Sequence, residues 1–396
     1  MTNSQKRTAA YILLLIIFCI LSMYLYALKF MTDYYPQFDG QAVFAFCLRQ
    51  ILRTAAGFLA GLLLTRHLDA EKFFNFSILL FAVPNLICTL PETEFNYHMY
   101  RGFYNVLGTH VYMIPFIYLG ILLLSYLTAI RRQIGLFEYC STFIAVLLLS
   151  CYSAAVKLMA VGTALIFAAA GTVMLFYTVR KEKISRKWAV LPAAAAAVIS
   201  VCTVVTYYTS PLSPLTRRLS LILTGGRSDP AGSGFYYIKI REALLSVRLI
   251  GRSSFSVGNV PGIYFFSQTY WNLDLLIIAL LGGWIAVLCI IAAQGSVIML
   301  IIKSAMKTRN PLTRHLGLFI ACLFSVRLAF SILSSTVCPL SNTGMMMFSS
   351  GWNRGIDMFL LTILYRMMRT DPQYTETMPK VLYRHHPDTD VQEKIY

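Results

Sequence analysis

LDLLIIALLGGWIAVLCIIAAQGSVIMLII, residues 273–302, contains one charged side chain, that of Asp274. As a single helix this run would be about 45 Å long, whereas the hydrocarbon core of a bilayer is about 30 Å thick. A spanning helix of this length either tilts strongly or bends, and Gly282-Gly283 and Gly295 are the positions at which a bend is easiest. The run therefore predicts a long membrane-spanning helix that begins near Asp274.

The same apolar character recurs along the chain of 396 residues, which are 57% hydrophobic and 13% charged, with a mean hydropathy of +0.64. A soluble globular protein has far more charged residues. A span needs roughly 20 apolar residues, and about ten runs approach that length. They lie near residues 9–30, 42–64, 73–90, 110–130, 139–156, 158–179, 188–208, 273–302, 315–336 and 353–369. We therefore predict an all-α, polytopic membrane protein with about ten transmembrane helices.

The pattern indicates one integral membrane domain over residues 1–370 and a polar cytoplasmic tail over residues 371–396, which we expect to be disordered. The first run, 9–30, has no small-residue cleavage site after it, and we interpret it as a retained transmembrane helix. The longest polar interruption, residues 209–272, is predicted to be an extracytoplasmic loop between the seventh and eighth helices.

The positions of the basic residues explain the net charge of +17. With the N-terminus in the cytoplasm, the basic clusters between the runs fall on the cytoplasmic side, as the positive-inside rule requires. They are Lys6-Arg7, Arg66 with Lys72, Arg131-Arg132, residues 180–187, residues 303–314, and Arg366 with Arg369. We therefore expect a multi-pass protein of the cytoplasmic membrane with both termini in the cytoplasm, and no binding to nucleic acid.

The loop over residues 209–272 is the outer segment that departs from this rule. Its only acidic residues are Asp229 and Glu242. Because a long external loop gains nothing for topology from positive charge, an anionic partner would explain its arginines and lysine. The alternative is a solvated loop whose cations meet lipid phosphates. The basic residues are Arg217, Arg218, Arg227, Lys239, Arg241, Arg248 and Arg252.

Part of this loop, residues 235–250, has roughly the spacing of an amphipathic helix. Phe235, Ile238, Leu245 and Leu249 would form its apolar side, although Glu242 falls within that side. Such a helix would lie along the membrane surface beside a lipid-borne substrate.

Charges inside the predicted spans are costly unless they face a partner or a cavity. Arg49 and Arg53 are four residues apart and share a helix face. Arg327 and Asp357 fall in the last two spans, where they would form an ion pair. Both sets are compatible with a structural role, with snorkelling to the interface, or with lining a substrate cavity.

Nine cysteines are scattered along the chain without a CxxC pair, and most lie inside apolar runs. They indicate neither a disulfide framework nor a metal site. We expect no cofactor, although a role for a divalent cation stays an open alternative.

The polar loop also contains RRL at residues 217–219 and GGRSDPAGSGF at residues 225–235. This stretch resembles the SEDS family, the RodA/FtsW/SpoVE-like membrane glycosyltransferases, in which an arginine-containing segment leads into D-P-x-G-x-G-Y. Phe235 stands in place of the tyrosine, and the matching residues are Asp229, Pro230, Gly232 and Gly234.

Three further matches extend the resemblance over most of the chain. Asp274 is the counterpart of the family's catalytic aspartate at the outer start of the eighth span. Arg49-Gln50 with Gly57 matches the second span, and Pro339 with the residues 349–351 matches the last outer loop. Ten spans and a long outer loop after the seventh are also what the family has.

The resemblance implies polymerisation of lipid II outside the cytoplasmic membrane, in cell shape, division or sporulation, beside a class B penicillin-binding transpeptidase. A sugar hydroxyl of one lipid-linked disaccharide would displace the polyprenyl pyrophosphate of another. Asp274 would act as the base, although an aspartate at a helix start is also a common cap. The turn residues would shape the loop without taking part in the chemistry. Candidate substrate-binding residues are Arg217, Arg218, Arg227, Arg241, Arg248, Arg49 and Gln50.

The chain is a divergent relative. Of the family's R-W and Q-P-S-E-x-x-K motifs, expected around residues 101–120, only Arg101 and Pro115 can be placed, and the Q-P-D-x-G motif is missing around residues 150–155. Two alternatives therefore stay open. One is a catalytically degenerate SEDS-like scaffold, and the other is a polymerase, ligase or flippase for another polyprenyl-linked oligosaccharide.

Overall fold

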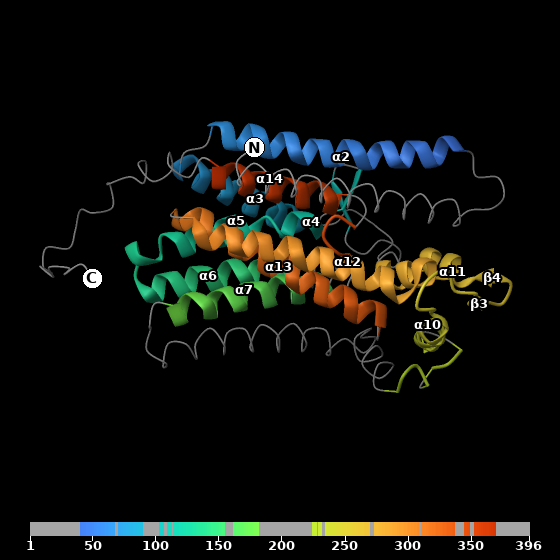
Figure 1. Ribbon diagram of the computed structural model, residues 1–396. Coiled ribbons are helices and arrows are strands. Elements are labelled where there is room, and N and C mark those ends of the chain that lie inside the picture. The colour runs from blue at the N-terminus through green and yellow to red at the C-terminus, as the bar shows by residue number, and fades with distance from the viewer. Residues whose placement is uncertain are drawn as a thin grey trace, which may run out of the picture.

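A computed structural model describes most of the central part of the chain. The described residues are 40–67, 70–89, 103–106, 109–112, 114–154, 161–181, 224–227, 229–231, 234–269, 273–308, 310–336, 344–348 and 352–369. Helices form a bundle and run roughly along one axis, with α10, α11 and the β3–β4 hairpin at one end, which we call the loop end (Figure 1).

The bundle helices are α2 (Gly40–His67), α3 (Ala70–Thr89), α4 (Ile114–Ile117), α5 (Gly120–Ala129), α6 (Leu136–Tyr152), α7 (Val161–Lys181), α12 (Asp274–Lys307), α13 (Pro311–Thr336) and α14 (Trp352–Arg369). The smaller elements are β1 (Phe103–Val106), β2 (Thr109–Tyr112), the 3-10 turn η1 (Arg131–Gln133), α10 (Gly234–Ser246), β3 (Ser256–Val257), β4 (Val260–Pro261) and α11 (Gly262–Thr269).

The prediction of an all-α polytopic membrane protein is confirmed. Within the described residues, four helices are long and apolar enough to cross a bilayer: residues 47–65 of α2, 162–180 of α7, α12 and α13. The predicted runs near 73–90, 139–156 and 353–369 correspond to α3, α6 and α14. The runs 9–30 and 188–208, with the tail 371–396, lie outside the described residues. The predicted total of about ten spans therefore stays a prediction.

One predicted span is wrong as a continuous helix. The run 110–130 begins as strand β2, which pairs with β1, continues as the single turn α4, and becomes helical again in α5. Between the two helices the backbone bonds of Leu119 and Ile121 go to carbonyls three residues back, at 3.1 Å each, which marks a tight turn. Hydropathy detects an apolar run but does not detect such an interruption.

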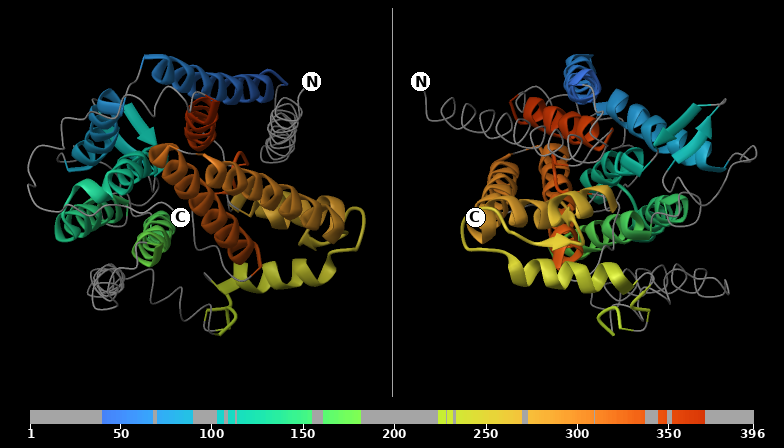
Figure 2. Two further views of the ribbon diagram at one scale, coloured as in Figure 1. Left: turned by 60° about the vertical axis from the view of Figure 1, so that its left-hand side comes forward. Right: turned by 90° about the vertical axis from the view of Figure 1, so that its right-hand side faces the viewer.

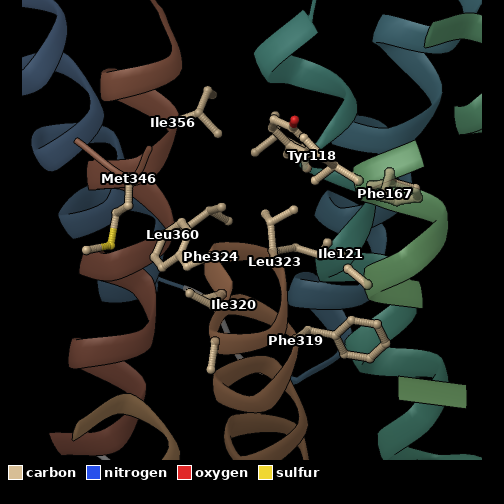
Figure 3. Packing of buried hydrophobic residues seen from close by; sticks show 14 of the residues in the cluster. Tyr118, Ile121, Phe167, Phe319, Ile320, Leu323, Phe324, Met346, Ile356 and Leu360 are labelled. Atoms are coloured by element: carbon tan, nitrogen blue, oxygen red, sulfur yellow. The ribbon is translucent and has the colours of Figure 1, made fainter. Parts of the chain in front are cut away.

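Helix α13 lies at the centre of the bundle and packs against α5, α7, α12 and α14 (Figures 1 and 3). Its buried face includes Phe319, Leu323 and Phe324, which meet Ile121 of α5 and Leu360 of α14 in one apolar core. Asn310 and Pro311 start this helix in the usual way. The Asn310 Oδ1 accepts the N–H of Leu312 at 2.9 Å, and proline is favoured in the first turn.

Helices α2 and α14 cross at glycines, and α2 lies at the periphery of the bundle (Figures 1 and 2). A Cβ on Gly57 would come within 2.0 Å of the Gly355 carbonyl oxygen, and one on Gly61 within 2.8 Å of Thr362. Small residues four apart let two helix backbones approach closely in a membrane, where apolar side chains alone give little preference for association. Gly57 and Gly61 therefore form the surface through which α2 contacts α14.

Candidate functional site

The predicted site residues in the 224–235 segment form a tight double turn that leads into α10. Gly225 and Gly226 have φ angles of +59° and +86°, which glycine adopts at low cost. The N–H of Asp229 donates to the Gly226 carbonyl at 3.3 Å, and that of Gly234 donates to the Asp229 carbonyl at 2.9 Å. Arg227 is exposed at the corner. The backbone of Asp229 thus takes part in two hydrogen bonds of the turn.

Gly226 and Gly234 of this turn are packed against each other. A Cβ on Gly226 would lie 2.4 Å from the Gly234 carbonyl oxygen, and one on Gly234 would lie 2.1 Å from that of Gly226. Neither position has room for a larger residue. Pro230 is exposed in the turn. Three of the predicted site residues, Arg217, Arg218 and Gly232, lie outside the described residues.

Helix α10 packs on α12 and is shorter than predicted. The structure buries Tyr237, Ile240 and Ala243, which are three residues apart, whereas Leu245 is 81% exposed and Leu249 lies beyond the helix end at Ser246. The predicted helix, residues 235–250, therefore extends too far, and Leu245 and Leu249 of its predicted membrane-facing side are exposed. Arg241 and Arg248, two candidate substrate-binding residues, are exposed. So is Glu242, which pairs with Lys239.

A second apolar cluster joins the loop to the start of α12. Ile240 and Ala243 of α10 and Ile263 and Phe266 of α11 surround the first turns of α12, through Leu273, Leu276, Ile277 and Leu280. In both views of Figure 2, α10 lies alongside α12. Aromatic rings of α10, of α11 and of the segment before β3 add to the packing. Phe265 stacks on Tyr236 at 5.6 Å and Phe266 on Phe255 at 6.2 Å between centroids. The loop therefore has an ordered core of its own.

Asp274 is the first residue of α12 and is only 7% exposed. It lies between Leu273 and Leu275, at the edge of the cluster just described, and all residues from 273 to 280 are buried. The N-terminus of a helix stabilises negative charge, so the site suits a carboxylate. The structure thus puts the predicted catalytic residue in a largely buried position at the loop end, next to the apolar cluster of α10 and α11.

Helix α12 bends at Gly283, one of the positions predicted from the sequence. There φ is +80° and ψ is −177°, so the backbone leaves the helical conformation. The bend frees backbone groups that the loop then satisfies. Trp284 and Ile285 donate to the carbonyls of Arg248 and Leu249 at 3.1 and 3.2 Å.

Two more hydrogen bonds run in the opposite direction. The N–H groups of Gly251 and Ser253 donate to the carbonyls of Gly282 and Leu280 at 3.3 and 2.8 Å. A Cβ on Gly283 would lie 2.7 Å from the Arg248 carbonyl oxygen. Residues 248–253 therefore form a backbone clamp across the bend, and we call them the clamp segment.

Two more predicted substrate-binding residues, Arg49 and Gln50, lie on α2. Gln50 is 1% exposed, whereas Arg49 is exposed and its Nε donates to the Ala45 carbonyl of its own helix at 3.3 Å. Arg53, one turn later, places its guanidinium 5.9 Å from the Trp352 ring centroid of α14. Arg49 and Arg53, which were predicted to share a helix face, thus make different contacts.

Arg327 and Asp357 form the predicted ion pair, 0% and 1% exposed. The Arg327 Nη2 lies 3.2 Å from Asp357 Oδ2 and also donates to the carbonyl of Gly344 at 3.0 Å. Arg327 Nη1 donates to Asp357 Oδ1, and Asp357 Oδ2 also accepts the N–H of Met347 at 3.0 Å. Met347 has a φ of +62°. The pair therefore holds the segment 344–348 between α13 and α14.

Gln294 of α12 was not singled out from the sequence, although it holds the same segment. Its Nε2 donates to the Met346 carbonyl at 2.9 Å, and the residue is fully buried. A glutamine in the middle of a long apolar run is the signal that could have identified it. Within the described residues, no group of three or more His, Cys, Asp or Glu side chains could hold a metal ion.

Neither a scan against protein-family models nor a search of curated proteins finds a match to this sequence. A comparison with solved structures does find matches. RodA of Thermus thermophilus superimposes with a TM-score of 0.56 at 13% sequence identity, over 90% of this chain and 96% of that one. The chain has the fold of the SEDS family.

A point mutant of the same RodA gives a TM-score of 0.57 over 90% of this chain and 97% of that one. A chain from a peptidoglycan synthase complex, described as coordinating polymerization and crosslinking, gives 0.64 at 16% identity, over 92% of this chain and 98% of that one. The SEDS-like fold thus extends over nearly the whole chain and not only over the loop motif that first indicated it.

Proposed function

We propose that this protein is a SEDS-type glycosyltransferase that polymerises lipid II, or a closely related polyprenyl-pyrophosphate-linked disaccharide, at the membrane face where the loop end lies. The observation that carries the proposal is the place of Asp274. In a chain with the SEDS fold, this carboxylate is buried at the first turn of α12 and adjoins the ordered, basic loop.

In the proposed reaction, the hydroxyl oxygen of one lipid-linked disaccharide attacks the anomeric carbon of another. The new glycosidic C–O bond forms as the bond to the pyrophosphate oxygen breaks, and polyprenyl pyrophosphate leaves with the electron pair. Asp274 accepts the proton of the attacking hydroxyl. A carboxylate within hydrogen-bonding distance of the attacking hydroxyl can accept its proton as a general base.

The leaving group needs cations because negative charge builds up on the pyrophosphate as the bond breaks. Arg217, Arg218 and Arg227 are the proposed source, since guanidinium groups bind phosphate oxygens through two parallel hydrogen bonds. The exposure of the Arg227 side chain in the turn supports this role. The clamp across Gly283 keeps the loop in a fixed position relative to Asp274, which a reaction between two bound lipids requires.

The likeness to a chain of a peptidoglycan synthase complex supports a partner that crosslinks glycan strands. We propose a class B penicillin-binding protein. The proposed setting is the cytoplasmic membrane with both termini in the cytoplasm, in elongation, division or sporulation.

The decisive experiment compares purified wild type with Asp274→Asn, using lipid II as substrate and separating glycan strands by gel. The matched control is Glu242→Gln, which neutralises an exposed carboxylate on α10 that pairs only locally with Lys239. Loss of a general base costs on the order of 10²–10⁴-fold in rate. We expect strands from wild type and Glu242→Gln and essentially none from Asp274→Asn. Equal activity of Asp274→Asn and wild type would remove the catalytic assignment.

A second candidate is a catalytically inactive scaffold with the same fold. It is favoured by the segment 103–120, FYNVLGTHVYMIPFIYLG, which contains no Asp, Glu or Lys and forms a hairpin with a broken helix. Wild-type protein that makes no strands, alone or with its transpeptidase, yet still binds that partner would support the scaffold. Transfer activity with another polyprenyl-linked oligosaccharide, but not with lipid II, would instead indicate a different polymerase or ligase.

A further inference from the structure

Three large apolar side chains at the end of α10 are exposed. Leu245 is 81% exposed, Leu249 is 66% and Ile250 is 69%. They follow one another within six residues, on a part of the chain that is fixed by hydrogen bonds. Isolated exposed leucines are ordinary on protein surfaces, but a fixed group of three is typical of a surface that meets an apolar phase.

The clamp segment places two of these residues against the lipid-facing side of α12. The Leu249 carbonyl accepts the N–H of Ile285, and Ile285 and Leu288 are 41% and 61% exposed on this spanning helix. Leu249 and Ile285 are therefore neighbouring exposed apolar residues, with Ile250 and Leu288 exposed close to them in the chain. Since Ile285 and Leu288 lie within a membrane span, the neighbouring clamp segment lies at the edge of the same membrane.

The length of α12 gives the depth of that edge. Residues 273–280 are buried within the protein, in the cluster with α10 and α11. From Gly283 to Lys307 the helix has a length of about 37 Å, which matches about 30 Å of hydrocarbon with moderate tilt. The bilayer boundary at the loop end thus falls near Gly283, at the level of the clamp segment.

Cations flank the apolar group. Arg248 and Arg252 are exposed on either side of Leu249 and Ile250, and Arg241 is exposed one helical turn before Leu245. Arginine at a bilayer edge keeps its stem in the apolar region and its guanidinium at the level of the lipid phosphates. Apolar residues interleaved with arginines at this depth have the chemistry of an interfacial anchor.

We propose that residues 245–252 insert into the bilayer leaflet at the loop end. Leu245, Leu249 and Ile250 lie among the acyl chains, and Arg248 and Arg252 bind the phosphates of anionic phospholipids. The occupant of this surface is the bulk lipid leaflet and not a second protein. The proposal does not depend on the glycosyltransferase activity. It keeps Leu245 and Leu249 of the predicted membrane-facing side, adds Ile250, and places the contact at the end of α10 and in the clamp segment.

Photo-crosslinking with benzoylphenylalanine, in membranes containing radiolabelled phospholipid, tests the insertion. The probe replaces Leu249 in one variant and Ile250 in a second. Leu288 is the lipid-facing reference, and Asn259, exposed at the tip of the β3–β4 hairpin, is the reference for water. All four positions are exposed, so the substitutions leave the packing intact, which size-exclusion chromatography checks.

We expect lipid adducts at positions 249 and 250 comparable to those at 288, with little label at 259. Labelling at 249 and 250 as low as at 259 would overturn the proposal. Crosslinks at these positions to a protein, in place of lipid, would also overturn it and identify the surface as a partner site. Because the readout is lipid labelling, the result is independent of catalysis and can be repeated with Asp274→Asn.

The arginine half of the proposal has its own test in the same assay. In vesicles of equal parts phosphatidylglycerol and phosphatidylcholine, the probe at position 249 should label the anionic lipid preferentially. Arg248→Gln/Arg252→Gln should remove most of that preference, on the order of a fivefold change for each arginine. Lys307→Gln, at the other end of α12, is the control and should leave it unchanged. An unaltered preference in the double variant would show that the arginines do not bind the phosphates.

Discussion

Arg327 of α13 and Asp357 of α14 are joined by a buried ion pair in which both charged groups also hold backbone atoms of residues 344–348. The Arg327 guanidinium lies 5.5 Å from the ring centroid of Tyr118 and 5.7 Å from that of Phe324 as well. One charge pair thus ties together two helices, a connecting segment and the end of α4, all at the apolar core.

Asp357→Ala should destabilise the protein strongly, because it leaves Arg327 buried without its countercharge. Removal of one partner of a buried pair costs about 3–5 kcal/mol. Replacement of both charges, as in Arg327→Met/Asp357→Leu, should be milder than either single change, because no isolated charge remains. Thermal unfolding in detergent, followed by intrinsic fluorescence, measures the order of the variants. A double variant less stable than Asp357→Ala would contradict this account.

Gly283→Ala should disrupt the bend of α12. The new Cβ would meet the Arg248 carbonyl oxygen at 2.7 Å, and the residue would have to keep a φ of +80°. We expect a loss of stability of about 2–3 kcal/mol or more from strain and lost clamp hydrogen bonds. The matched control is Gly295→Ala on the same helix, where a Cβ meets nothing within 4 Å. That change should be neutral or stabilising by up to about 1 kcal/mol. Equal unfolding temperatures for the two variants would argue against the clamp.

Gly225 and Gly226, in the turn that precedes α10, allow the effect of backbone conformation to be tested apart from the effect of close packing. Both have positive φ, but only Gly226 is in close contact, with the Gly234 carbonyl oxygen, whereas a Cβ on Gly225 meets nothing within 4 Å. Gly225→Asn should therefore retain most of the glycan-strand synthesis from lipid II, since asparagine tolerates a positive φ. Gly226→Ala should reduce it on the order of 10²-fold, by displacing the basic turn. Comparable rates for the two variants would mean that the shape of the turn does not matter for the reaction.

Gly57→Leu should separate α2 from α14, because even a Cβ would lie 2.0 Å from the Gly355 carbonyl oxygen. Ala60→Ile on the exposed side of the same helix is the control and should be tolerated in lipid. Crosslinking between cysteines introduced in α2 and α14 follows the contact directly. Retained crosslinking in Gly57→Leu, at the wild-type yield, would contradict the proposed packing.

The sequence predicted most of the helical architecture, because hydropathy reports the transfer of whole segments into lipid and needs no knowledge of their neighbours. It also predicted the Arg327–Asp357 pair, since two opposite charges at membrane depth are stable only together. The position of the bend in α12 was limited to Gly282-Gly283 or Gly295. The choice of Gly283 depends on carbonyl groups of Arg248 and Leu249, which the local sequence of α12 does not contain.

The end of α10 was wrong for a related reason. Periodicity included Leu249, which lies outside the helix, and did not identify Ala243, whose small side chain allows close approach to α12. Likewise the glycine crossing of α2 and α14, and the hydrogen bond from Gln294 to Met346, depend on partners distant in the chain. Asp274 was identified by resemblance, and only the structure shows that it is buried.

The bend at Gly283 also bears on how the protein is assembled in the cell. Without the clamp segment, the N–H groups of Trp284 and Ile285 would face lipid with no acceptor, which a bilayer strongly disfavours. We therefore expect a newly inserted α12 to begin as a continuous helix in which those groups bond within the helix itself. The bend would then form when the preceding segment docks on it. Such docking would exchange hydrogen bonds within one helix for hydrogen bonds between two parts of the chain.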